Sequence, residues 1–204
     1  MKSKLRRQTL AVALLLIILV SVVSTAWAGK WALGSITFRI GSLEAEGDLR
    51  GTGNTDYAAV LTGYARVTAL CQNKGGNTAP GRNPITARVI QTGWFTTQKN
   101  GRSFFDITAE NPTIAQLSPS PTPKQAGCPN GNWKVVGVDG SSVVWQYASI
   151  IGYEAARFDF NKGVPMPGAQ PLFAYNFACS YGVPGDNSTF GCSQVGFTVP
   201  PAGW

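Results

Sequence analysis

The sequence contains no histidine among its 204 residues, and this absence excludes several common chemistries. Histidine is the general base of Ser-His-Asp and Cys-His hydrolases and a ligand in most zinc sites. Charged residues are also scarce, at 13% of the chain, and no nucleophile elbow or Ser-x-x-Lys motif occurs. The sequence therefore predicts a protein that is not an enzyme and that has no catalytic residues, cofactors or metal ligands.

A long apolar run occurs at the N-terminus and nowhere else. Four basic residues within positions 2–7 precede an apolar stretch at 10–23 and an Ala-x-Ala cleavage pattern at 26–28. This order is typical of a secretory signal peptide, here predicted for residues 1–28. The mature chain would begin at Gly29, with no membrane span after cleavage and a location outside the cell or at its surface.

Little net charge is left once the signal is removed. The chain has 17 basic and ten acidic residues, and four of the basic ones lie in the signal. The thirteen that remain form no cluster or stripe, so we expect no nucleic-acid partner.

Cysteines number only four, which in an exported chain predicts two disulfides. Three pairings are possible, and we favour Cys71–Cys128 with Cys179–Cys192 because each bridge then stays within its own region. The loop-closure model assigns them about 4 and about 3 kcal/mol of stabilisation.

The mature chain shows no useful helical periodicity, and its patterned segments are β-like. A turn-rich stretch at 71–84 and hairpin signals at Asn100-Gly101 and Asp139-Gly140 separate them. Gly63 is expected to mark a bulge or bend. The sequence predicts an all-β fold, an immunoglobulin-like antiparallel β-sandwich at residues 29–160. The expected strands are 31–40, 43–50, 57–71, 85–97, 103–109, 133–138, 142–151 and 153–160.

From residue 161 the composition shifts to glycine, proline and aromatic residues. We interpret 161–204 as a Gly/Pro-rich extension that packs on the sandwich and is closed by Cys179–Cys192. Because no period would bury its aromatic side chains, they form the predicted contact surface for association. These residues are Phe173, Tyr175, Phe177, Tyr181 and Phe190.

Two further sets of residues are candidates for chemistry. Glu44, Glu46 and Asp48 alternate along one strand face, where carboxylates could bind calcium or act on a glycoside, although we favour an ordinary solvated strand face, completed by Arg50, as their explanation. Aromatic side chains could stack on sugars or fill the core. Trp133 follows Cys128 closely and is expected to pack on that disulfide in the core.

Three motifs carry a resemblance to a protein family. They are G-S-L-x-A-x-G-x-L-x-G-x-G-N-x-D at 41–56, C-x-N-x-G-G-N-x-A-P-G-x-N-P at 71–84 and C-P-N-x-N-W at 128–133. Over residues 41–145 the chain resembles small exported bacterial β-sandwich proteins of unassigned function. The resemblance implies an exported bacterial protein with its first two cysteines paired, and it supplies no catalytic residues.

Three functions therefore follow from the sequence as hypotheses. The first is a non-enzymatic exported protein that acts in adhesion or self-assembly, with itself or with cell-surface components as partner. The alternative is a carbohydrate-binding module, and a carboxylate-based glycosidase comes third.

Overall fold

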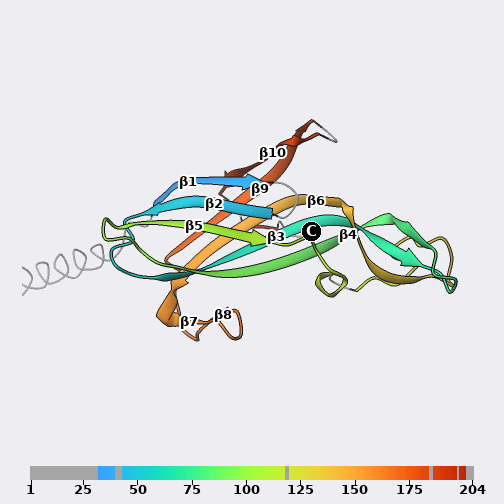
Figure 1. Ribbon diagram of the computed structural model, residues 1–204, viewed down its shortest axis with the longest axis horizontal. Helices are drawn as coiled ribbons and strands as arrows, with labels where there is room; N and C mark the ends of the chain where they lie inside the picture. Colours follow the sequence, from blue (N-terminus) through green and yellow to red (C-terminus); the bar gives the residue numbers. More distant parts are fainter. Residues whose placement is uncertain (1–31, 40–42, 118–119, 184–185, 197, 201–204) are drawn as a thin grey trace, which may run out of the picture. The chain divides into compact units, whose positions relative to one another are not determined.

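The computed structural model describes residues 32–39, 43–117, 120–183, 186–196 and 198–200 (Figure 1). Ten antiparallel strands are described, in sheets ordered β1-β2-β5, β10-β9-β6-β3-β4 and β7-β8. The strands are β1 (Ala32–Arg39), β2 (Leu43–Arg50), β3 (Tyr57–Gln72), β4 (Thr78–Phe95), β5 (Arg102–Ala109), β6 (Lys134–Glu154), β7 (Phe158–Asp159), β8 (Val164–Pro165), β9 (Phe173–Val183) and β10 (Asp186–Val195). Two short 3-10 turns, η1 (Ile114–Gln116) and η2 (Ala155–Arg157), complete the described elements. The all-β prediction is confirmed.

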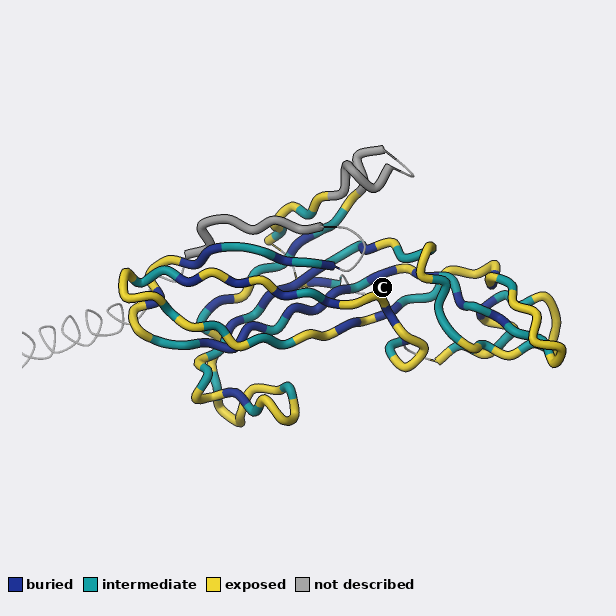
Figure 2. The backbone as a smooth tube through the Cα atoms, in the orientation of Figure 1, coloured by how far each residue is buried: buried dark blue, intermediate teal, exposed yellow. Residues whose placement is uncertain are grey.

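The three-stranded and five-stranded sheets share one apolar core. Period-2 alternation puts Leu43, Ala45 and Leu49 of β2 in this core, together with the inward side chains of β3, β4, β5, β6 and β9. Figure 2 shows the buried positions along the middle of these strands and the exposed ones at the turns. Each of the two sheets therefore has one buried face and one outer face.

The tryptophan at the centre of the core is Trp145, not Trp133. The Trp145 side chain is fully buried, whereas Trp133 is only half-buried. Trp145 lies over Gly63, where an added Cβ would stand 2.5 Å from its ring and 2.8 Å from Leu43. The glycine therefore makes room for the indole, and β3 pairs with β4 in unbroken register through this position.

Residues 134–154 form one strand rather than the predicted hairpin at Asp139-Gly140. Both halves of β6 pair with the same partner, β3, through a ladder with three register shifts. The polar side chains that predicted a turn form hydrogen bonds inside the strand instead. Asp139 Oδ1 accepts from Ser141 N at 3.0 Å, and Ser142 Oγ accepts from Thr68 N at 2.7 Å. A bulge therefore satisfies the polar residues that indicated a turn.

The turn-rich stretch at 71–84 is mostly strand. The turn itself spans only residues 73–77, where Asn73 Oδ1 accepts from Asn77 N at 3.0 Å and Gly76 has φ +83°. Cys71 is buried and bonded to Cys128 with a Cα–Cα distance of 5.8 Å, as predicted. The disulfide thus joins the end of β3 to the segment that runs beside β4.

The C-terminal segment is built into the five-stranded sheet. β9 pairs with β6, and β10 pairs with β9, so residues 173–195 continue the sheet and do not form a layer packed on it. Cys179 and Cys192 are opposite each other in this last hairpin and form the second predicted disulfide. Because β9 supplies core residues, the sheet needs this segment to close its apolar face.

The two disulfides indicate that the protein matures in an oxidising environment of the extracellular type. The predicted signal peptide at 1–28 lies outside the described residues. Within the part of the chain that the structure describes, no helix is both long and apolar enough to cross a bilayer.

Candidate functional site

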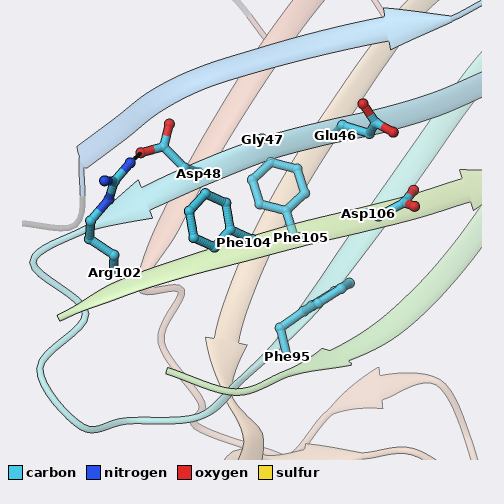
Figure 3. Close-up of a pocket in the computed structure, with 8 residues that line it drawn as sticks. All are labelled: Glu46, Gly47, Asp48, Phe95, Arg102, Phe104, Phe105 and Asp106. Atoms are coloured by element: carbon cyan, nitrogen blue, oxygen red, sulfur yellow. Dashed lines mark hydrogen bonds and ion pairs between the residues drawn. The ribbon is translucent and has the colours of Figure 1, made fainter. Parts of the chain in front are cut away.

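The outer face of the three-stranded sheet carries a group of carboxylates. Glu44 and Glu46 alternate outward along β2, and Asp106 of β5 lies directly opposite Glu46. Oxygens of the three carboxylates lie within 4.8 Å of one another, and Figure 3 shows Glu46 and Asp106 on neighbouring strands. The sequence predicted the first two members of this group and missed Asp106, which only strand pairing brings to them.

Asp48 has a structural environment of its own. It is 5% exposed, and its Oδ2 accepts from Arg102 Nη2 at 2.9 Å and from Arg50 Nε at 3.4 Å. The Arg102 guanidinium also lies 5.4 Å from the centroid of the Phe104 ring. Figure 3 shows the Asp48–Arg102 contact at one end of the face. This ion pair joins β2 to β5, so Asp48, which the sequence grouped with Glu44 and Glu46, does not belong to the group of carboxylates that the structure brings together.

A hollow of about 650 Å³ lies beside these groups, lined in part by Glu46, Asp106 and the exposed Phe104. The two carboxylates project side by side from adjacent strands. A glycosidase instead places its carboxyl groups on either side of the bond that is cleaved. The arrangement is therefore suited to binding a cation or a basic partner group through the outer face.

A second hollow, of about 720 Å³, has an aromatic wall. Trp94 of β4 is 63% exposed, and its ring centroid lies 5.8 Å from that of Phe160. Asp56 and Glu154 line the same hollow, although Asp56 Oδ1 already accepts from Thr97 N at 3.1 Å. An exposed indole beside polar groups is an arrangement that can stack on a sugar ring.

The outer face of the five-stranded sheet is the third candidate surface. Arg88, Ile90 and Trp94 alternate outward along β4 and are all exposed, at 45% for Ile90. Arg66 of β3 is exposed on the same face, and the Arg88 guanidinium lies 5.9 Å from the Tyr64 ring centroid. The sequence of β4 already shows these residues at alternating positions. They are recognised as a surface only because the structure places the residues between them, Ala87 and Val89, in the core.

The predicted aromatic contact surface is corrected in part. Phe173 and Phe177 are 6% and 1% exposed, because both point into the core from β9. Tyr175 is half-buried against the same core and stacks on Phe173 at 5.8 Å. Tyr181 and Phe190 are paired across the last hairpin, and their side chains lie outside the described part of the chain.

The edges of the five-stranded sheet matter for association, because an open edge can pair with another chain. β4 carries Pro80 and Pro84, which sheets tolerate on edge strands. Leu117 forms a bridge to Ala87, and residues 126–127 accept backbone hydrogen bonds from Arg82 and Asn83 of β4. These contacts cover the first half of the β4 edge.

Comparisons of the chain with models of protein families, with curated proteins and with solved structures found no match. The class of protein is therefore given by the fold alone, an all-β protein with antiparallel sheets and two disulfides.

Proposed function

We propose that the protein is an exported, non-enzymatic β-sandwich of immunoglobulin-like general form that acts by self-association or adhesion outside the cell or at its surface. The two disulfides and the two sheets around one core support this form and location. The family resemblance of residues 41–145 to small exported bacterial β-proteins belongs to the same proposal.

The observation that carries the proposal is the exposed outer face of the five-stranded sheet. Exposed Ile90 and Trp94 lie on it, with Val144 of β6 also 37% exposed. Exposed apolar side chains on a sheet face favour contact with another surface, since burying them removes apolar area from water.

A non-enzymatic role is supported by the carboxylate geometry. Glu46 and Asp106 lie on one open strand face and reach a ligand from the same side. A general acid in a glycosidase is held protonated by an apolar pocket, whereas the Asp106 side chain is exposed.

The proposal is tested on the purified protein by light scattering and sedimentation over a range of concentrations. The wild-type protein should associate as its concentration rises. Ile90→Glu places a charge among the exposed side chains of the β4 row on the outer face and should abolish association. Gln91→Glu adds the same charge one residue away, where the side chain is not on that face, and should leave association intact. A wild-type protein that stays monomeric at every concentration contradicts the proposal.

Carbohydrate binding is the second candidate, and the exposed Trp94 beside Phe160 favours it. A soluble polysaccharide that stacks on this wall should change the tryptophan fluorescence in a titration. Trp94→Ala should remove that binding, and Phe104→Ala, an exposed aromatic on the other sheet, should not. If the wild-type protein binds none of a panel of soluble polysaccharides, this candidate fails.

A further inference from the structure

The second hollow, of about 720 Å³, brings together residues from three neighbouring strands. Tyr57, the first residue of β3, pairs with Phe95 of β4 and with Glu154 of β6. Asp56, Trp94 and Glu154 therefore lie at the same end of the five-stranded sheet, and all three line the hollow. Its volume falls in the range of small-ligand sites, about 300–1,000 Å³.

The aromatic wall of the hollow is held in place by the chain that follows β6. Ala155 N donates to Asp56 O at 3.0 Å, so the chain turns across the end of β3. Phe160 then packs on Phe158, with 5.0 Å between the ring centroids, and Phe158 is only 3% exposed. Phe160 also contacts Trp94. The exposed indole therefore rests on a ring that is itself anchored on a buried one.

The charge of the hollow comes from Asp56 and Glu154. Asp56 Oδ1 accepts from Thr97 N at 3.1 Å, which fixes the orientation of that carboxylate. Lys162 of the adjoining hairpin is paired with Asp159, at 3.2 Å between Nζ and Oδ2. The residues that form the wall include two carboxylates and no basic side chain; they are 54–56, 94, 154–156 and 160. An aromatic surface and two negative charges thus border the same space.

We propose that this hollow binds a protonated amino sugar, a hexopyranose with an ammonium group on its second ring carbon. The inference rests on carbohydrate binding, the second candidate function, and names the class of sugar. A pyranose presents a face of C–H groups that can stack on the Trp94 indole, while its substituents project from the rim of the ring. In the amino sugar one substituent is a cation, which can donate a charge-assisted hydrogen bond to Asp56 or Glu154.

Both the aromatic wall and the carboxylates enter this choice of ligand. A neutral sugar would stack on the indole, but its hydroxyl groups lack the cationic charge that strengthens a hydrogen bond to a carboxylate. A small ammonium ion would be attracted by the carboxylates and the ring faces, but it would cover little of an indole that is 63% exposed. The amino sugar matches the apolar surface and the charge together.

The test compares a glucosamine tetramer with an N-acetylglucosamine tetramer of the same linkage, in calorimetric titrations of the purified protein. The two ligands share the ring and differ in the charge on the second ring carbon. One exposed ion pair strengthens binding by up to about fivefold, so the glucosamine tetramer should bind roughly three- to tenfold more tightly. Added salt should narrow the difference, because exposed charges are screened.

Variants assign this preference to the hollow. Asp56→Asn/Glu154→Gln removes both charges, keeps an acceptor for Thr97 N, and should bind the two tetramers equally. Glu154→Gln alone, at an exposed side chain, should lower the preference in the same direction. Trp94→Ala should lose both tetramers. Glu110→Gln removes an exposed carboxylate after the end of β5 and should behave as wild type. Circular dichroism checks that each variant is folded.

The outcomes separate this inference from the function on which it rests. A protein that binds no polysaccharide at all overturns both, whereas one that binds other polysaccharides but neither tetramer overturns this inference alone. Equal binding of the two tetramers, lost in Trp94→Ala, overturns only the choice of an amino sugar. A preference that survives in Asp56→Asn/Glu154→Gln overturns the assignment to this hollow. If methylammonium displaces the tetramer as well as free glucosamine does, the charge alone is recognised and the sugar is overturned.

Discussion

Removing residues 161–204 should unfold the protein, because this segment supplies part of the core and not only a surface. Phe173 and Phe177 of β9 are both buried there. Truncating a buried phenylalanine to alanine costs about 3–5 kcal/mol, so losing both costs about 6–10 kcal/mol. A domain is stable by only about 5–15 kcal/mol in total. The deletion also removes the β6–β9 ladder and the second disulfide.

The assay is urea unfolding followed by far-UV circular dichroism. Phe177→Ala should lower the unfolding free energy by about 3–5 kcal/mol, while Ser180→Ala, at an exposed position of the same strand, should change it by less than about 0.5 kcal/mol. The truncated chain should show no cooperative transition. A truncated chain that unfolds cooperatively at the wild-type midpoint would refute the role assigned to β9.

Three further outcomes are expected. Gly63→Ala should cost about 1–3 kcal/mol in thermal unfolding, because the new methyl group would stand 2.5 Å from Trp145; an unchanged midpoint would show that the ring can move aside. Burial raises the pKa of Tyr57 to about 12, so the stability it contributes should be complete below about pH 10 and fall as the pH rises toward 12. Tyr57→Phe should flatten that part of the pH profile, and an unaltered profile would assign the loss to other groups. Replacing the Cys71 disulfide by serines should cost more than replacing the Cys179 disulfide, about 4 against about 3 kcal/mol, and the reverse order in urea unfolding would count against loop closure as the cause.

The β4 segment shows how far alternation in a sequence can be interpreted. Residues 85–97 are recognisable as a strand, and their outward row contains Arg88, Ile90 and Trp94. Nothing in that row says whether it faces a core, a partner or water. Only the positions of β3 and β6 show that it continues into one broad surface.

Local turn signals were reliable in one place and misleading in another. Asn100-Gly101 does form the turn between β4 and β5, with Gly101 at φ +69°. Asp139-Gly140 has the same chemistry, yet β3 is long enough to pair with both sides of it. The long β3–β6 ladder gives more backbone N–H and C=O groups a hydrogen-bond partner than a hairpin would. The polar residues around Asp139 are therefore accommodated in a bulge of the strand.

The sequence by itself determined the β class, the number of disulfides and most of the strands, because side-chain alternation, cysteine number and turn residues are local properties, whereas the favoured cysteine pairing was confirmed by the structure. It did not determine which aromatic residues are buried. Phe173, Phe177 and Trp145 enter the core because β9 and β6 are adjacent in the sheet, and Asp106 joins Glu44 and Glu46 because β5 is adjacent to β2. Strand order is set by contacts between distant segments, and those contacts form only when the whole core is assembled.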